Sequence, residues 1–256
     1  MSDLIRFCQT LLNLAKLDEE PFFGSLDVAT SKTVEPAALV FIHGYLVTFA
    51  EAIRRTAQIA YDLDFQGVPI CYSWPSAGKF ALYAADETSV DWTVPHLTEF
   101  LHRVATMEGV RVIHLVAHSM GNRALVNCLD KLAQQAAAGI TMKARIKQAI
   151  LAAPDIDAGV FRQLARSSAD LALRVSQQFH RYPRAGESGP DLLVLPQIDT
   201  VDASSIPAGF LGHSYYGDSQ RVLADVHELI KSGGAPPRFG LRPSGDQGKK
   251  FWIFVP

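Results

Sequence analysis

Short apolar runs alternate with helical repeats along this chain, and this alternation restricts the fold more than any other feature. Five runs have the length and composition of buried strands: Ala38–Ile42, Val68–Tyr72, Val110–Val116, Ala149–Ala153 and Leu192–Leu195. Between them, apolar residues recur every three or four positions, at Ile53, Ala57, Ala60 and Leu63, at Leu97, Leu101 and Val104, and at Leu125, Leu129 and Leu132. Strands separated by helices form βαβ units. The sequence therefore predicts an α/β fold, with a mostly parallel central sheet and helices on both faces.

The two ends of the chain differ from this central region. Residues 1–35 are expected to form an N-terminal helix and a lead-in, because Leu4, Phe7, Leu11, Leu14 and Leu17 fall on one helical face. Residues 36–232 are predicted to form one domain, whose last helix ends at Gly233-Gly234. Residues 233–256 are expected to be an irregular segment rich in Gly and Pro. Its apolar end, Phe251–Val255, must be covered by the body of the protein or by another subunit.

Composition excludes several classes of protein. Hydrophobic residues make up 48% of the chain and charged residues 20%, with a net charge of −2, so the chain has material for a core and no basic surface for nucleic acid. Its three cysteines show no disulfide or metal spacing, and no metal or other cofactor is expected. Charged residues interrupt every apolar run well before the ~18 residues of a membrane span. A cytoplasmic protein is favoured, although a chain that has lost a leader peptide would have the same sequence.

The strongest chemical signal surrounds Ser119. The predicted strand ending at Val116 leads directly into Ala117-His118-Ser119-Met120-Gly121, and a helical repeat follows. A strand, a small-x-Ser-x-Gly turn and a helix together are the context of a nucleophile elbow, although Ala117 stands where that motif has glycine. The pattern predicts that Ser119 is a catalytic nucleophile.

A serine nucleophile needs a base and a carboxylate that orients the base. In α/β hydrolases both follow the serine, in the order Asp or Glu and then His. Three histidines lie downstream, and only His213 falls in a glycine-flanked loop, between the run at 192–195 and the last helix. His213 is therefore the predicted base, whereas His180 and His227 are expected to be surface or packing residues.

An oxyanion hole needs backbone N–H groups that face the developing charge. The N–H of Met120, directly after the nucleophile, is the expected first donor. The second is assigned to Tyr45, with Leu46 as the alternative, because the first strand ends in His43-Gly44-Tyr45. His43 is expected to brace this loop.

Loops at the carboxyl ends of the strands line the cleft of such a fold. Ser73, Trp74 and Tyr215 lie in such loops and are the expected substrate-lining residues, although Trp74 could equally belong to the core.

Several motifs of the chain occur together in one known family. They are Phe41–Tyr45, Tyr72–Ser76, Ala117–Arg123, Ala153–Asp157, Ser167–Leu173 and Gly212–Tyr216. In this order they resemble the bacterial α/β-hydrolase family catalogued as domain of unknown function 900, over residues 36–232. The resemblance implies an α/β-hydrolase fold with a lipase-like or esterase-like site, in which Ser119 is the nucleophile, Asp170 the acid and His213 the base.

The chain departs from this family at the proposed acid. Members usually carry a strand just before the Ser-Ser-x-Asp segment, whereas residues 160–166 here have a helical pattern. Either a segment is missing near Ala165–Ser167, or Asp155, at the end of the preceding strand, supplies the carboxylate. Asp170 is favoured and Asp155 is the alternative.

These features together predict a serine hydrolase that cleaves a carboxylic ester through an acyl-enzyme on Ser119. The expected partner is a small-molecule ester or a lipid. Two alternatives remain open: an acyltransferase with the same triad, and a non-catalytic binding protein of the same fold. The presence of both Ser119 and His213 argues against the second alternative.

Overall fold

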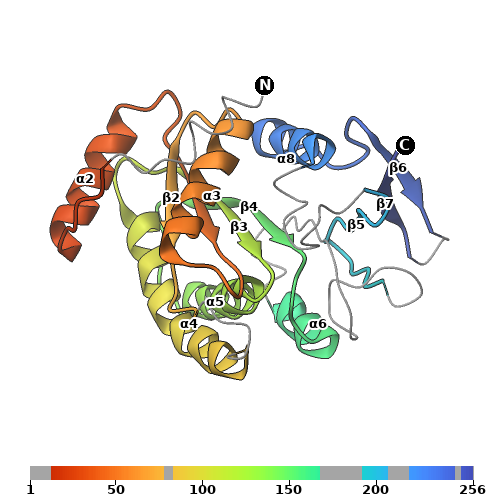
Figure 1. The fold of residues 1–256 in the computed structure, drawn as a ribbon, viewed down its shortest axis with the longest axis horizontal. Coiled ribbons are helices and arrows are strands. Elements are labelled where there is room, and N and C mark those ends of the chain that lie inside the picture. Colours follow the sequence, from red (N-terminus) through yellow and green to blue (C-terminus); the bar gives the residue numbers. More distant parts are fainter. Residues whose placement is uncertain (1–12, 78–82, 168–191, 207–218, 246–248, 256) are drawn as a thin grey trace.

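A parallel sheet forms the centre of the molecule. The computed structural model describes residues 13–77, 83–167, 192–206, 219–245 and 249–255. Its main sheet consists of β1 (Ala37–Ile42), β2 (Val68–Tyr72), β3 (Val112–His118) and β4 (Arg145–Ala152), in the order β2-β1-β3-β4 (Figure 1). Each neighbouring pair is parallel. These strands confirm the first four predicted runs and the predicted α/β class.

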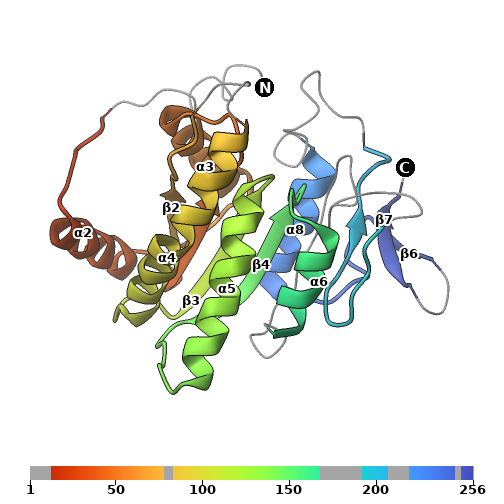
Figure 2. The same ribbon diagram turned by 90° about the horizontal axis from the view of Figure 1, so that it is seen from below.

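Helices cover both faces of this sheet. They are α2 (Glu19–Ser31), α3 (Phe49–Asp62), α4 (Tyr83–Thr106), α5 (Gly121–Ala137), α6 (Ala158–Ser167) and α8 (Gln220–Ser232). The helices α4, α5 and α6 lie on one face, and α3 and α8 lie on the other (Figures 1 and 2).

The residues of β1 show why both faces are covered. Val40 and Ile42 belong to the core under α4 and α5, while Leu39 and Phe41 belong to the core under α3 and α8. Successive side chains of a strand point to opposite faces, so a strand buried along its whole length needs a helical layer on each side.

A second, smaller sheet lies beyond β4. It consists of β5 (Val201–Asp202), β7 (Phe251–Phe254) and β6 (Leu241–Ser244), with β7 in the middle (Figure 1). Trp252 and Phe254 are buried in the core that contains α8, whereas Val255 is 43% exposed, so the apolar end of the chain is covered in part. The segment after α8 is less irregular than expected, since it contributes β6.

Helix α8 ends where the sequence predicts. Gly233 follows its last residue at φ 65°, a left-handed conformation that glycine adopts without strain. After it, the buried guanidinium of Arg238 binds both carboxylate oxygens of Asp225, at 2.6 and 3.0 Å, and so joins the C-terminal segment to α8.

Two predicted elements differ from the structure. Leu192–Leu195 form no strand, because the chain folds back at once: Ile198 N–H donates to Leu195 O at 3.3 Å, and the Thr200 hydroxyl donates to Leu193 O at 3.1 Å. Near the N-terminus, residues 13–18 are not helical, and Leu14 and Leu17 are 64% and 46% exposed. The first described helix, α2, begins at Glu19, where acidic side chains occupy the first turn and favour a helix start. The other residues of that predicted face, at 4–11, lie outside the described residues.

Among the residues that the structure describes, no helix is both long enough and apolar enough to cross a membrane.

Candidate active site

The turn between β3 and α5 holds Ser119 in an unusual backbone conformation. Its φ is 50°, in the left-handed region that residues other than glycine seldom adopt. The Ser119 N–H donates to Ala152 O of β4 at 3.0 Å, and α5 begins two residues later. A strained serine between a buried strand and a helix has the geometry of a nucleophile elbow.

Two glycines bring this turn against the loop that follows β1. A Cβ atom on Gly121 would lie 2.4 Å from His43 O and 2.8 Å from Ile42 O, and one on Gly44 would lie 2.9 Å from Ser119 Cβ. These positions have no room for a side chain. The structure thus brings the elbow at Ser119 against Gly44, the residue directly before Tyr45.

The peptide that joins Ser119 to Met120 is held firmly from its carbonyl side. Ser119 O accepts from the N–H of Asn122 at 3.1 Å, from Asn122 Nδ2 at 2.8 Å and from the N–H of Asp155 at 3.2 Å. In a trans peptide the C=O and the following N–H point in opposite directions. The three donors therefore fix the direction of the Met120 N–H.

Asn122 lies within the motif Ala117–Arg123, but the sequence assigns it no role at the site. It is fully buried, and its Nδ2 also donates to Ala152 O at 3.0 Å, so it links the elbow to the end of β4. The signal in the sequence that could have indicated this role is a polar residue at the start of an otherwise apolar helix face.

The loop after β1 is held through a histidine ring. Nδ1 of His43 lies 2.9 Å from Gly44 O, and its Nε2 lies 3.1 Å from Ser73 Oγ. A carbonyl oxygen can only accept, so Nδ1 carries a proton. Burial lowers the pKa of His43 and so favours the neutral ring, in which Nε2 accepts from the Ser73 hydroxyl. The bond to Gly44 O fixes the peptide that carries the Tyr45 N–H, which agrees with the predicted bracing role of His43.

Trp74 supports this loop from inside the protein. Its ring stacks on His43 with centroids 5.2 Å apart, and its Nε1 donates to His43 O at 2.7 Å. The side chain is only 3% exposed, which favours a place in the core, the alternative that the sequence leaves open for Trp74. The bond to His43 O satisfies the indole N–H in that buried position. Ser73 remains half-buried at the same loop.

The alternative second donor, Leu46, follows in the same loop. It has a φ of 60° and a side chain that is 40% exposed.

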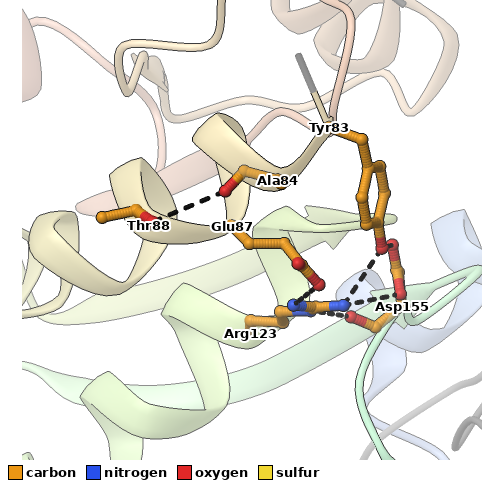
Figure 3. Close-up of polar contacts among 6 residues, drawn as sticks. All are labelled: Tyr83, Ala84, Glu87, Thr88, Arg123 and Asp155. Carbon is orange, nitrogen blue, oxygen red and sulfur yellow. Dashed lines mark hydrogen bonds and ion pairs between the residues drawn. The ribbon is translucent and has the colours of Figure 1, made fainter. Parts of the chain in front are cut away.

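Asp155 lies just after β4, with its carboxylate in a polar network (Figure 3). Oδ2 accepts from the Tyr83 hydroxyl at 2.7 Å, and Oδ1 accepts from Arg123 Nη2 at 3.2 Å. Arg123 also donates through Nη1 to Glu87 at 2.7 Å. The Arg123 cation thus lies between two carboxylates, those of Asp155 and Glu87.

The remaining predicted site residues, Asp170, His213 and Tyr215, lie outside the described residues, as does His180. Helix α6 confirms the helical pattern predicted at 160–166, so the described stretch from the end of β4 to residue 167 contains no further strand. His227 Nδ1 donates to Leu63 O at 2.7 Å, and this agrees with its predicted packing role. Within the described ranges, no cluster of three or more His, Cys, Asp or Glu side chains could hold a metal ion.

The parallel sheet covered on both faces and the strained turn at Ser119 define the class of α/β hydrolases. A family model described as "Alpha/beta hydrolase of unknown function (DUF900)" matches residues 25–232, and the chain belongs to this family. The match confirms the resemblance found in the sequence.

More distant similarities were also found. An uncharacterized protein of Nostoc sp. strain PCC 7120, alr1448, is 34% identical over 65 residues, which span 25% of this chain and 17% of that protein. An iodinated complex of an acetyl xylan esterase is 18% identical, with a TM-score of 0.43, over 77% of this chain and 98% of its own. An extracellular α/β-hydrolase from a Paenibacillus species is 11% identical, with a TM-score of 0.34, over 78% of this chain and all of its own.

Proposed function

We propose that the protein is a serine hydrolase that cleaves a carboxylic ester through an acyl-enzyme on Ser119. The observation that carries the proposal is the backbone of Ser119, at φ 50° between β3 and α5 and directly against the loop after β1. Such strain persists only where the surrounding structure holds it, and it is common at active sites. Membership of an α/β-hydrolase family supports hydrolase chemistry.

The proposed reaction has two steps. The Ser119 hydroxyl attacks the ester carbonyl carbon while its proton passes to His213, and the N–H groups of Met120 and Tyr45 stabilise the negative oxygen. The alcohol then leaves with the proton from His213. Water next attacks the acyl-enzyme, with His213 as base, and releases the acid and free Ser119. Tyr215 is the proposed substrate-lining residue, whereas Ser73, expected beside it from the sequence, is proposed to hold the loop after β1 through His43. Small esters or lipids are the proposed substrates.

Asp170 is the proposed acid that orients His213. The contacts of Asp155 favour this choice over the alternative, because the Asp155 carboxylate already binds Tyr83 and forms an ion pair with Arg123. A triad acid must instead accept from the N–H of the catalytic histidine and stabilise its positive charge. The nearby guanidinium would weaken that electrostatic effect.

The proposal is tested with a fluorophosphonate probe and a series of p-nitrophenyl esters of increasing acyl length. Ser119→Ala is expected to keep its melting temperature, lose all labelling and lose hydrolysis by at least about 10⁴-fold. Ser31→Ala, which removes an exposed hydroxyl at the end of α2, is the matched control and is expected to label normally. Labelling of a serine other than Ser119, located by mass spectrometry, would contradict the proposal. Adding a primary alcohol distinguishes acyl transfer from hydrolysis, because a transferase would form the new ester faster than it releases the free acid.

A further inference from the structure

A buried ionic network lies directly behind the proposed active site and joins three separate elements (Figure 3). Tyr83 is the first residue of α4, Arg123 lies in the first turn of α5, and Asp155 follows β4. Nη2 of Arg123 reaches both the Tyr83 hydroxyl, at 3.1 Å, and Asp155 Oδ1, at 3.2 Å. The side chains of Arg123 and Asp155 are only 21% and 7% exposed, so these charges are largely shielded from water.

One branch of the network reaches the peptide of the first oxyanion donor. Arg123 Nε donates to Asp155 O at 2.7 Å, while the Asp155 N–H donates to Ser119 O at 3.2 Å. Arg123 thus holds both the backbone and the carboxylate of Asp155. Because Ser119 O and the Met120 N–H belong to one peptide, a shift of Asp155 would release a restraint on the direction of that N–H.

The other branch reaches the loop of the second donor. The ring of Tyr83 packs edge-on against the ring of Tyr45, with centroids 5.2 Å apart and an interplanar angle of 72°. The Tyr83 hydroxyl donates to Asp155 Oδ2 at 2.7 Å, which fixes the far end of that ring. The same ionic network therefore supports the residues on both sides of the proposed oxyanion hole.

We infer that Asp155, Arg123 and Tyr83 are positioning residues that set the relative placement of the Met120 and Tyr45 N–H groups. The inference rests on the proposed ester hydrolysis at Ser119 and assigns Asp155 to this network instead of to the triad. Donors held in place before reaction stabilise the transition state without reorganisation. Loosening the network should therefore slow the chemical step and leave substrate binding unchanged.

Tyr83→Phe is the most selective test, because it removes one hydroxyl and keeps the ring against Tyr45. We expect kcat for a p-nitrophenyl ester to fall about tenfold, with KM within about twofold of the parent, as for loss of an interaction made in the transition state. Asp155→Asn and Arg123→Gln are expected to lower kcat further, on the order of 10²-fold, within the range for losing one oxyanion donor. Arg123→Lys keeps the charge and should recover part of the Arg123→Gln loss.

Matched changes far from the site control for general effects. Tyr61→Phe removes an exposed tyrosine hydroxyl from α3, and Arg103→Gln removes a surface arginine that pairs with Glu19 and Glu20. Both controls should keep the parent kcat and KM. A variant that lowers the melting temperature but keeps kcat would show that the network only stabilises the fold, and this result would overturn the inference.

The pH profile separates positioning from acid catalysis. If the network positions the donors, Asp155→Asn changes the height of the kcat profile and not the pKa of the catalytic base, which is read from the acidic limb of the profile. A loss of about 10⁴-fold, with the profile displaced, would identify Asp155 as the triad acid and overturn the inference. A failure of the proposed ester hydrolysis would give a different result, because the parent protein itself would then neither hydrolyse esters nor be labelled at Ser119. If Asp155→Asn does not fold, Tyr83→Phe and Arg123→Lys still decide the question.

Discussion

The two turns that meet at Ser119 carry out similar tasks with different chemistry. The elbow after β3 is held by amide donors, from Asn122 and the backbone of Asp155, that act on Ser119 O. The loop after β1 is held by an imidazole ring, since His43 Nδ1 donates to Gly44 O. In both turns a donor restrains the carbonyl oxygen of the peptide whose N–H is a proposed oxyanion donor. The groups that donate directly to the elbow are amides that do not titrate, whereas the loop is held by an imidazole ring, which can titrate.

The largest effect is expected where the two turns touch. Gly121→Ala would place a Cβ atom 2.4 Å from His43 O, a backbone atom that cannot move aside alone. We expect a loss of at least about 3 kcal/mol in the free energy of unfolding, measured by urea titration, because overpacking here displaces backbone. Fluorophosphonate labelling should also fall severely.

Gly24→Ala is the matched control for this change. Gly24 lies within α2, and a Cβ there meets no atom within 4 Å. It should gain up to about 1 kcal/mol from the better helix propensity of alanine. Equal stability of the two variants would show that the turns are not packed as closely as the structure indicates.

The elbow alone is broken by Asn122→Asp, which keeps the shape of the side chain and removes both of its N–H donors. At neutral pH a carboxylate would face Ser119 O and Ala152 O in a fully buried position. We expect a loss of roughly 2–3 kcal/mol in unfolding free energy, typical of buried donors replaced by a repelling acceptor, together with a lower kcat.

The expected pH dependence of that variant follows from its environment. Burial beside two carbonyl oxygens raises the pKa of a carboxyl group, and the protonated form regains one O–H donor. Part of the loss should therefore disappear as the pH falls through this raised pKa. Asn127→Asp is the control on the same helix: Asn127 donates to Arg123 O at 2.8 Å but is half-buried, so its loss should be smaller. If both variants lose equal stability, the elbow does not depend specifically on Asn122.

The two turns also differ in how well the sequence predicts them. The elbow is a local pattern in which small residues, a serine and the change from strand to helix lie within a few positions, so the sequence alone is enough to locate it. The contacts that hold it are long-range. The Tyr83 hydroxyl and the Asp155 carboxylate are 72 residues apart, and no local pattern indicates that they meet.

The errors in predicting the fold have the same origin. The run Leu192–Leu195 is apolar because Leu192 and Leu193 are buried, and burial alone does not distinguish a strand from a folded-back loop. The position of Trp74 after a strand does not decide between the substrate wall and the core, because the partner of its indole N–H, His43 O, lies 31 residues earlier. Alternating runs predict strands and helices well, whereas the direction of a loop side chain depends on tertiary contacts.

The smallest effect is expected at the loop after β1, where Ser73 acts only through His43. Its hydroxyl lies 3.1 Å from Nε2 and donates to the neutral ring, which keeps the proton on Nδ1 and directs it to Gly44 O. In Ser73→Ala the bond between Nδ1 and Gly44 O remains, so the ring keeps its main restraint. We expect kcat to fall only about threefold to tenfold with KM unchanged, equivalent to about 1 kcal/mol. Ser25→Ala, which removes an exposed hydroxyl from α2, should leave both constants unchanged. A raised KM with an unaltered kcat would instead make Ser73 a substrate contact, as the sequence predicts. The Tyr45 N–H would then be held in place through His43 and Trp74, without a contribution from Ser73.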